Sequence, residues 1–282
     1  MRAASDPRAA ATLAFDRLAP EYDSLVGGEI FQLLRRRTHR AFARRFPPGS
    51  RVLEIGCGTG LDTSFLASRG VEVIACDPSE EMVSRSLRRL ARDGCESRTT
   101  VLPCGIQDLA AFLETLTDSN LRGTFDGIVS NFGALNCVEH LAPLATLARG
   151  YLRPGGIVLV TLMSRFCALE ALYFLASGRR QLATRRGGSG AVAVPVAGVA
   201  VPTFYHRITE VDAALGADVR LAAIEGLGVA IPPPFLETRW CQMPASLRGL
   251  MTRLDSLVAP LPLFNRVGDH VLLHFVKGNA HA

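Results

Sequence analysis

The sequence predicts an α/β fold in which a mainly parallel sheet carries helices on both faces. Between residues 51 and 162, short apolar and β-branched segments alternate with longer segments of helical periodicity, the pattern of strands joined by crossover helices. The first short segment, R-V-L-E-I, runs directly into glycines at alternate positions, which allow a sharp turn at the end of a strand. The 282 residues, 48% of them hydrophobic, suffice to bury a large core.

Two helical patterns, over residues 9–19 and 29–46, precede the first strand, and the second is rich in arginine and ends at two prolines. The alternating part predicts strands over 51–55, 71–76, 98–103, 124–130 and 156–162, separated by helices over 61–69, 79–93, 106–117 and 139–152. Ser79 is the expected N-cap of the helix over 79–93.

Residues 163–282 extend beyond this alternating unit. A helix over 166–176, a basic loop over 179–190 and an edge hairpin over 191–205 form a predicted insertion after the fifth strand. A helix that starts at Thr209, with Asp212 completing a capping-box-like pattern, precedes a strand over 219–231. A helical segment over 236–258 and a last strand over 269–276 follow. The predicted segments are an N-terminal helical lid (1–50), a core (51–162), a cap (163–208) and a C-terminal part (209–282) with a helical insertion (232–267).

The spacing of the glycines indicates which ligand the loop can hold. In the dinucleotide fingerprint a third glycine opens the helix, but Leu61 occupies that position here, which argues against NAD or FAD. A phosphate-binding loop with its lysine is also excluded, because Lys277 is the only lysine in the chain. Two carboxylates flank the loop instead. Glu54 lies two residues before Gly56, and Asp77 ends the second strand, where an acid can accept hydrogen bonds from ribose hydroxyls.

Four ordered motifs, L-E-I-G-C-G-T-G, C-D-P-S-E-E-M, F-D-G-I-V-S-N and L-R-P-G-G, resemble those of the class I S-adenosylmethionine (SAM) dependent methyltransferases. The resemblance implies a Rossmann-like class I methyltransferase fold with a seven-stranded, mostly parallel sheet that ends in an antiparallel hairpin. It also implies SAM as cofactor, S-adenosylhomocysteine (SAH) as product and no metal. The residues it places at the cofactor are Tyr22, Glu54, Gly56, Cys57, Gly58, Gly60, Asp77, Pro78, Met82, Ile106, Gln107 and Asn131.

The stretch after the third strand departs from the family pattern. Members commonly have a Gly-Asp pair there, whose aspartate meets the adenine amino group, whereas this chain has C-G-I-Q-D. Either Gln107 or Asp108 replaces that acid, or backbone groups around Ile106 hold the adenine.

The N-terminal segment F-D-R-L-A-P-E-Y-D, residues 15–23, is similar to the opening of many small-molecule methyltransferases, including the menaquinone and ubiquinone C-methyltransferases. In such enzymes this segment folds over the cofactor, and Tyr22 would lie near its methionine end. The alternative is a helix that only packs on the sheet.

The acceptor side is expected beyond the fourth strand, at N-F-G-A, residues 131–134. This stretch lacks the Asn-Pro-Pro-aromatic run of the methyltransferases that act on adenine in nucleic acids, which argues against that class. Candidate substrate-binding residues are Phe132, Asn136, His140, Phe174 and Trp240. Tyr205 and His206 are the candidate general base pair. Each of these also has a structural interpretation, as core, cap or dimer surface.

The leading functional hypothesis is methyl transfer to a small, apolar metabolite or natural-product intermediate. A quinone-type C-methyltransferase is the first alternative, although the fifth strand continues as T-L-M-S-R rather than in the Leu-Glu-Phe manner of those enzymes. A catalytically silent SAM-binding partner subunit and a basic RNA methyltransferase are alternatives of other classes.

Composition sets further expectations. The seven cysteines are odd in number and form no C-x-x-C pair, so neither a disulfide framework nor a zinc site is expected. The net charge of +5 is carried by arginine clusters near residues 35–45 and 179–186. These clusters either steer an acidic substrate, nucleic acid or an anionic membrane surface, or form solvated faces. No apolar run reaches the roughly eighteen residues of a membrane span, and Asp6 and Asp16 interrupt any signal-peptide pattern. We expect a cytoplasmic protein with a small-molecule substrate and no nucleic acid partner, and a homodimer is one option.

Overall fold

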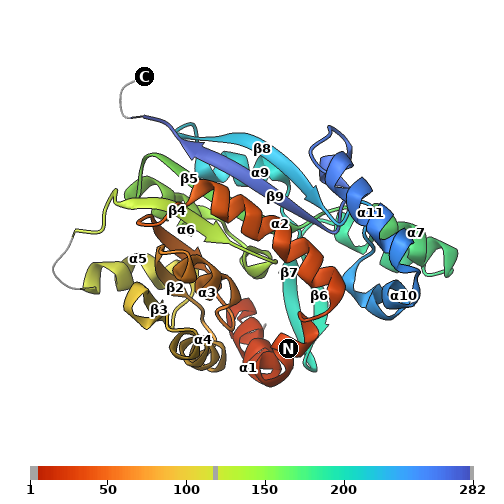
Figure 1. Ribbon diagram of the computed structural model, residues 1–282, viewed down its shortest axis with the longest axis horizontal. Coiled ribbons are helices and arrows are strands. Elements are labelled where there is room, and N and C mark those ends of the chain that lie inside the picture. The colour runs from red at the N-terminus through yellow and green to blue at the C-terminus, as the bar shows by residue number, and fades with distance from the viewer. Residues whose placement is uncertain (1–5, 117–119, 280–282) are drawn as a thin grey trace.

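Seven strands form one sheet in the order β3-β2-β1-β4-β5-β9-β8 in the computed structural model, which describes residues 6–116 and 120–279 (Figure 1). The strands are β1 (Arg51–Ile55), β2 (Glu72–Cys76), β3 (Thr99–Leu102), β4 (Phe125–Ser130), β5 (Leu152–Met163), β8 (Val219–Leu227) and β9 (His270–Lys277). Strands β1 to β5 are parallel, whereas β9 runs antiparallel to both β5 and β8. The predicted seven-stranded, mostly parallel sheet is confirmed.

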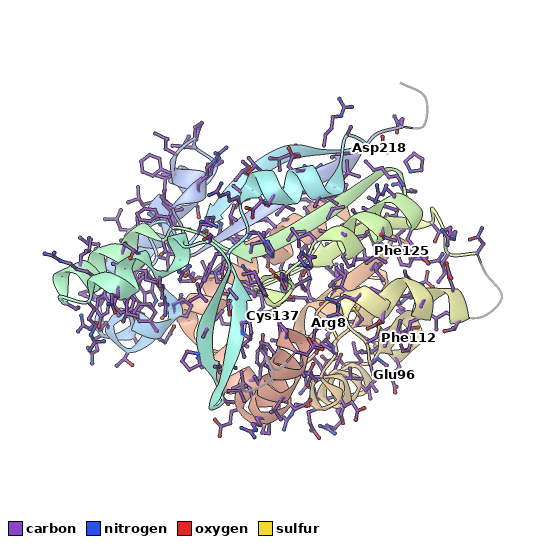
Figure 2. All side chains as sticks on the ribbon, turned by 180° about the vertical axis from the view of Figure 1, so that it is seen from behind. Arg8, Glu96, Phe112, Phe125, Cys137 and Asp218 are labelled. Atoms are coloured by element: carbon purple, nitrogen blue, oxygen red, sulfur yellow. The ribbon has the colours of Figure 1, made fainter. Side chains whose placement is uncertain are left out.

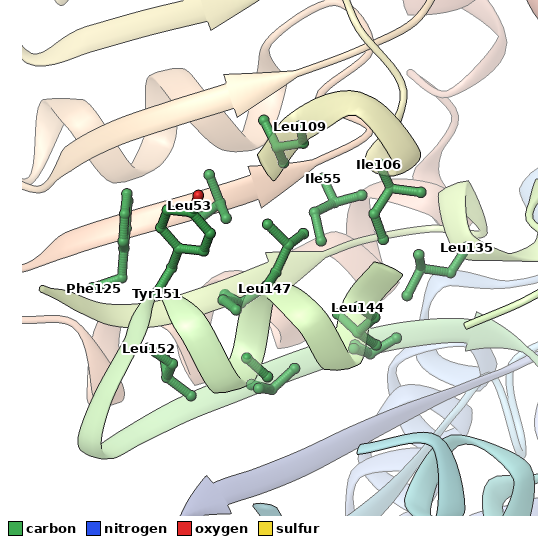
Figure 3. Packing of buried hydrophobic residues seen from close by; sticks show 14 of the residues in the cluster. Leu53, Ile55, Ile106, Leu109, Phe125, Leu135, Leu144, Leu147, Tyr151 and Leu152 are labelled. Carbon is green, nitrogen blue, oxygen red and sulfur yellow. The ribbon is translucent and has the colours of Figure 1, made fainter. Parts of the chain in front are cut away.

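Helices cover both faces of this sheet. On one face lie α5 (Ile106–Thr115), α6 (Ala142–Gly150) and α9 (Ile208–Leu215), packed on strand residues such as Leu53 and Phe125 (Figure 3). On the other face lie α2 (Glu29–Arg45) and α3 (Leu61–Ser68), and α4 (Glu80–Arg92) follows β2. The large buried residues of this second face are Phe42, Phe46 and Trp240. Helices thus cover both faces of the sheet. A ligand site is therefore expected at the edge formed by the carboxyl ends of the strands.

The N-terminal helix α1 (Pro7–Leu25) is longer than expected. The predicted end at residue 19 was wrong, because Pro20 lies inside the helix. Beyond the proline, the second half is held by Asp23, which accepts a hydrogen bond from Thr59 at 2.6 Å and pairs with Arg89 at 2.5 Å. The helix that became α5 was predicted to end at residue 117, which lies outside the described residues. The same holds for residues 1–5 and 280–282 at the two ends of the chain.

The insertion after β5 consists of α7 (Ala168–Ala176), α8 (Arg180–Thr184), the 3-10 turn η3 (Arg185–Gly187) and a hairpin of β6 (Ala191–Val196) and β7 (Val199–Phe204). Seen from behind, the hairpin stands apart from the main sheet and passes close to Cys137 (Figure 2). It packs on Ala11 and Ala14 of α1 through Val201. The predicted irregular loop over 179–190 was wrong, because Arg186 is buried against Glu170 and orders that stretch.

A second insertion separates β8 from β9. It contains η4 (Pro234–Leu236), α10 (Glu237–Gln242), α11 (Ala245–Val258) and η5 (Phe264–Arg266). The predicted continuous helix over 236–258 is divided, because Pro244 has no N–H to donate into a helix and instead serves as the N-cap of α11. The remaining short turns are η1 (Glu96–Arg98) and η2 (Ala134–Cys137).

Other boundaries also differ from the prediction, among them the start of β5, which begins at Leu152 and not at residue 156. Helix α9 is capped by Arg207 and not Thr209, and Glu210 accepts a hydrogen bond from the Arg207 N–H at 2.8 Å. Strand β8 ends at Leu227, because Gly228 adopts a positive φ of 70° and turns the chain. The predicted start of α6 at residue 139 was three residues early.

The first arginine cluster is not a uniformly solvated face. Arg35 is buried and pairs with Asp62 at 2.7 Å, and Arg37 pairs with both Glu225 and Asp255. The solvated-face interpretation was therefore wrong for these two arginines, which fasten α2 to α3 and to the C-terminal part. Among the helices of the described residues, none is long and apolar enough to cross a membrane.

The contact between α2 and β4 yields a prediction on stability. A Cβ atom on Gly127 of β4 would lie 2.2 Å from the Phe46 ring, so Gly127→Ala overpacks the core and lowers the free energy of unfolding by about 1–3 kcal/mol. The matched control is Gly249→Ala in α11, where nothing lies within 4 Å of the added atom. It is expected to stabilise by about 0.5–1 kcal/mol. Urea denaturation measures both, and equal effects of the two substitutions would contradict this packing.

Candidate active site

The glycine turn after β1 shows why each glycine is needed. Gly56, Gly58 and Gly60 all have positive φ values, of 73°, 54° and 79°. A Cβ on Gly56 would lie 2.3 Å from the Ala134 side chain, and one on Gly60 would lie 2.5 Å from the Ser86 hydroxyl. Above Gly58, however, the nearest atom is in the Tyr22 ring at 3.9 Å. The outer two glycines permit close packing, and the middle one presents bare backbone toward Tyr22.

Asp77 is fixed beside this turn. Its Oδ2 accepts a hydrogen bond from the Gly58 N–H at 2.9 Å, and its Oδ1 accepts one from the Ser79 N–H at 3.0 Å. Burial raises the pKa of Asp77 to about 6, and the two backbone donors act against that rise. A carboxylate held by two backbone donors at the end of β2 presents its remaining lone pairs in a defined direction.

Glu54 lies at the end of β1 and is almost fully buried, and it accepts a hydrogen bond from the Thr63 hydroxyl at 2.7 Å. Burial raises its pKa to about 8, and the neighbouring charge of Asp62 adds to the rise. A cation placed near Glu54 would favour the ionised carboxylate and regain the free energy that burial costs.

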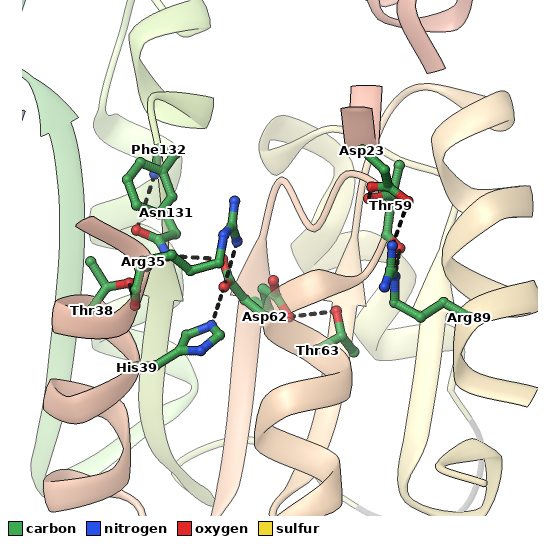
Figure 4. Close-up of polar contacts among 11 residues, drawn as sticks. Asp23, Arg35, Thr38, His39, Thr59, Asp62, Thr63, Arg89, Asn131 and Phe132 are labelled. Atoms are coloured by element: carbon green, nitrogen blue, oxygen red, sulfur yellow. Dashed lines mark hydrogen bonds and ion pairs between the residues drawn. The ribbon is translucent and has the colours of Figure 1, made fainter. Parts of the chain in front are cut away.

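A buried polar cluster joins α2, α3 and the end of β4 (Figure 4). Asp62 accepts hydrogen bonds from Arg35 at 2.7 Å and from Asn131 at 2.8 Å, and His39 Nε2 lies 2.7 Å from the same carboxylate. Asn131 also donates to the Thr38 hydroxyl at 3.1 Å. Burial raises the pKa of Asp62, but Arg35 and His39 outweigh burial and hold it well below its usual range. Asn131, a predicted cofactor residue, is thereby oriented by side chains of two helices.

Sequence reasoning missed this cluster because its partners are far apart in the chain. Arg35 belongs to a run of three arginines, a pattern typical of a solvated helix face. His39 and Asp62 belong to none of the motifs. The helical spacing of Arg35, Thr38 and His39 was the available signal, since residues three and four apart share one helix face.

Helix α1 is tied to the carboxyl edge of the sheet at both acids of its F-D…Y-D motif. Asp16 accepts a hydrogen bond from the Ser79 hydroxyl at 2.6 Å, and Asp23 accepts one from Thr59 at 2.6 Å. Between these ties Tyr22 stands over Gly58, and burial raises the pKa of its phenol to about 12. Ser79 also caps α4 by accepting from the Met82 N–H at 3.1 Å, so the predicted N-cap is confirmed.

The other predicted cofactor residues lie along the same edge. Cys57, Met82 and Ile106 are buried. Pro78 lies between Asp77 and Ser79 and is exposed. Gln107 lies in the first turn of α5 and is partly exposed, and a Cβ on Gly105 would meet its Oε1 at 2.9 Å. The assignment of adenine contacts to Gln107, Asp108 or the backbone at Ile106 stays a prediction.

Beyond β4, where the acceptor is expected, Phe132 has a strained backbone, with φ of 46°, a region that non-glycine residues rarely adopt. Its ring lies 4.8 Å from the Arg35 guanidinium, and it meets His270 edge-on at 5.4 Å and Phe31 at 5.9 Å. Phe132 thus lies between the buried polar cluster around Asp62 and the start of β9.

The remaining predicted acceptor residues occupy different surroundings. Asn136 is fully buried, donates to the Phe204 carbonyl at 2.7 Å and accepts from the Met163 N–H at 2.9 Å. Trp240 is fully buried in the α2 face of the core, and Phe174 stacks on Phe235 at 5.5 Å. His140 is exposed before α6. Contact of these four residues with a substrate stays a prediction.

The predicted base pair lies after β7. His206 Nε2 is 2.8 Å from the Val138 carbonyl and 3.3 Å from the Leu135 carbonyl, so this nitrogen donates to backbone and its ring is fixed on η2. Burial raises the pKa of the neighbouring Tyr205, whose ring lies 5.7 Å from the Arg186 guanidinium. Their catalytic role stays a prediction.

A second histidine, which sequence reasoning missed, lies closer to Phe132. His270 begins β9 opposite Met163 of β5, and its Nδ1 is 3.0 Å from Asp269 Oδ2, although the angle falls outside hydrogen-bond geometry. Asp269 also accepts from Arg186 at 2.7 Å. Burial raises the pKa of Asp269, but the neighbouring His270 and Arg186 outweigh burial and hold this pKa well below its usual range. The Asp-His pair at the start of the last strand was the available sequence signal.

The chain matches the family described as a methyltransferase domain over residues 26–195, more than half of its length. It therefore belongs to this methyltransferase family. The match and the strand order together confirm the class I SAM-dependent methyltransferase fold that the motifs indicated.

Curated relatives match about half of the chain. It is 33% identical to the demethylmenaquinone methyltransferase of Beutenbergia cavernae over 165 residues, which cover 56% of this chain and 61% of that protein. The demethylmenaquinone methyltransferase of Parafrankia sp. is 31% identical over 159 residues, 54% of this chain and 61% of that protein. The tRNA 5-carboxymethoxyuridine methyltransferase of Escherichia coli is 28% identical over 149 residues, 51% and 54% of the two chains. The match spans less than two thirds of each relative.

Solved structures share the fold over most of the chain. The [4+2]-cyclase SpnF superposes with a TM-score of 0.62 at 16% identity and covers 96% of both chains. Phosphoethanolamine N-methyltransferase 2 of Haemonchus contortus, in complex with S-adenosyl-L-methionine, has a TM-score of 0.52 at 16% identity and covers 94% of this chain and 57% of that one. At these identities the likeness shows the fold alone.

The raised pKa of Glu54 predicts a pH effect on stability. Because this pKa is about 8 in the folded protein and 4.5 ordinarily, the native state binds the extra proton, and stability falls as pH rises from about 4.5 to 8. The slope from one group is at most about 1.4 kcal/mol per pH unit. Glu54→Gln removes this term, so the variant's free energy of unfolding should rise relative to wild type across that window. Urea denaturation at constant ionic strength measures it, and a difference that does not change with pH would contradict the assignment.

Proposed function

We propose that this protein is a SAM-dependent methyltransferase that transfers a methyl group by in-line displacement to a small, apolar acceptor. The observation that carries the proposal is the Asp77 carboxylate, hydrogen-bonded to the backbone of the open Gly58 turn. Membership of the methyltransferase family supports the same reaction class.

The residues at the strand ends fit the chemistry of the cofactor. Asp77 would accept from the ribose hydroxyls, and the bare backbone at Gly58, beside Tyr22, would let a ligand approach the turn closely. The buried Glu54 would bind the ammonium group of the methionine part, which compensates its unfavourable burial. The buried side chains of Met82 and Ile106 would flank the adenine.

When bound, SAM supplies a methyl group already activated on a sulfonium. The protein then has to align the acceptor and exclude water, and positioning of this kind can contribute roughly 7–11 kcal/mol. The two ties of α1, at Asp16 and Asp23, place Tyr22 as a cover over the glycine turn. Asn131, fixed by Asp62 and Thr38, and Phe132, held in a strained conformation, form the boundary toward the acceptor.

For an acceptor that must lose a proton, the structure offers His270 as a base in addition to His206. Among the described residues no group hydrogen-bonds to His270 Nε2, while its Nδ1 faces the Asp269 carboxylate. His206 Nε2 donates to the Val138 carbonyl, so its ring is held on η2 with Nδ1 as the acceptor nitrogen. The ring of His270, in contrast, meets Phe132 edge-on at 5.4 Å. Because Phe132 lies at the boundary toward the acceptor, we assign the proton-accepting role to His270 and a positioning role to His206.

A quinone-type acceptor is the second candidate. It is favoured by the 31% and 33% identity to demethylmenaquinone methyltransferases and by the N-terminal motif shared with such enzymes. The acceptor side includes His270 of β9 and the insertions around it, and the short-chain demethylmenaquinones are the substrates to assay first.

The cofactor assignment predicts a calorimetric result. The wild-type chain should bind SAH, and Asp77→Asn should bind it about 10- to 100-fold more weakly, because one charged hydrogen-bond acceptor is lost. Glu72→Gln is the matched control, since Glu72 begins the same strand and pairs with Arg51 at the surface. Equal affinities of the two variants, or binding of a nicotinamide dinucleotide in place of SAH, would contradict the cofactor assignment.

The assignment of the base predicts a kinetic difference between two histidines. The assay uses a short-chain demethylmenaquinone as acceptor and measures the release of SAH. His270→Ala should lower kcat by about 10²- to 10⁴-fold and make kcat less dependent on pH. His206→Ala should keep that pH dependence and mainly lower stability, because it loses a backbone tie. The reverse pattern would return the role to His206. Binding of SAH without methyl transfer to this or any other acceptor would favour the catalytically silent subunit.

A further inference from the structure

Helix α11 turns its apolar side toward solvent and its polar side toward the protein, the reverse of a usual surface helix. Its only buried residue is Asp255, whereas Leu247, Leu250, Leu254 and Leu257 are 42%, 62%, 47% and 71% exposed. At 3.6 residues per turn these four leucines fall within an arc of about 80° on one side of the helix. Amphipathic helices normally turn that side toward the core.

The inverted packing follows from the contacts of Asp255. Its carboxylate pairs with Arg37 of α2 and accepts a hydrogen bond from the Ala230 N–H at 2.8 Å. An ion pair and backbone bonds therefore fasten α11 to the body of the protein by its polar side. The leucine side meets no buried cluster within residues 6–116 and 120–279.

The apolar side continues beyond the helix. Leu261, Leu263 and Phe264 are 47%, 81% and 47% exposed, and Leu263 has a positive φ of 73°, a conformation that costs free energy for a branched residue. We call Leu247, Leu250, Leu254, Leu257, Leu261, Leu263 and Phe264 the leucine face. The strained backbone at Leu263 directs a large apolar side chain into solvent, where a soluble monomer gains nothing from it.

The surroundings of the leucine face are basic. Residues 163–190, the part of the first insertion before its hairpin, and residues 232–267 of the second contain nine arginines and three acids. They carry a net charge of +6, while the rest of the chain carries −1. Two of the three acids, Glu170 and Asp255, are buried in ion pairs, and Glu237 accepts from the backbone of Glu29 at 2.6 Å. Arg239, Arg253 and Arg266 are exposed. In Figure 1, α11, α10 and α7 gather at one end of the molecule.

We propose that the leucine face docks this protein on an anionic lipid surface, with α11 lying in the plane of the interface. Apolar side chains flanked by arginines match the two layers of such a surface, the acyl boundary and the negatively charged headgroups. A second copy of the chain would bring two regions of charge +6 together, which opposes self-association through this face. The exposed leucines distinguish the face from a nucleic acid site, whose affinity rests on phosphate contacts. The proposal does not depend on methyl transfer.

Vesicle co-sedimentation of the full chain tests the proposal. The protein should bind vesicles made of phosphatidylglycerol and phosphatidylcholine in equal parts and bind pure phosphatidylcholine vesicles much more weakly. The binding should weaken as salt is raised, because the arginine term is screened. The double variant Leu254→Glu/Leu257→Glu should bind the mixed vesicles at least about tenfold more weakly, since two apolar side chains are lost from the interface.

Leu87→Glu is the matched control, because Leu87 is 50% exposed on α4, away from the leucine face. It should leave vesicle binding unchanged, and all variants should keep the circular dichroism spectrum and unfolding midpoint of the wild type. The proposal is overturned if the wild type does not bind the mixed vesicles, or if Leu87→Glu weakens binding as much as the double variant. It is also overturned if light scattering shows a dimer that the double variant dissociates while no vesicle binding occurs.

Discussion

The structure depends on the hydrogen bond between the Gly58 N–H and the Asp77 carboxylate. This bond spans the ends of two neighbouring parallel strands and holds an acid against a backbone turn that only glycines can form. Because both groups lie at the carboxyl edge of the sheet, the bond sets the shape of the edge where open α/β sheets bind ligands. Helix α1, the Ser79 cap and the Asp62 cluster are all arranged around it.

The buried carboxylates along this edge differ in how far the protein itself compensates their burial. Glu54 and Asp77 have raised pKa values because burial dominates, whereas Asp62 and Asp269 are held low by arginine and histidine partners. The first pair is thus poorly compensated in the protein alone, and a ligand that brings a cation or hydroxyl donors relieves that cost. The second pair is satisfied internally and serves to fix Arg35, Asn131 and His270 in position. In the proposed function, Glu54 and Asp77 bind the ligand, whereas Asp62 and Asp269 position other side chains.

The alternating core was predictable, because its signals are local. The apolar run before Gly56 and the acid after β2 are read within a few residues, and the strand order confirmed the fold that they indicated. The pairing of Arg35 with Asp62, and of Asp269 with Arg186, was not predictable, because each joins residues whose neighbourhood exists only after folding. The division of the helical segment at Pro244 was visible in the sequence, but the outward direction of its leucines was not, since Asp255 reverses the usual orientation through tertiary contacts.

Hydrogen exchange measured by mass spectrometry, with and without SAH, tests the central claim most directly. If the Gly58 turn and Asp77 hold the adenosyl group, SAH should slow amide exchange in peptides covering residues 51–60 and 77–82, and leave β8 at the far edge of the sheet unchanged. Protection confined to other segments, or protection of the glycine turn by a nicotinamide dinucleotide and not by SAH, would contradict the account.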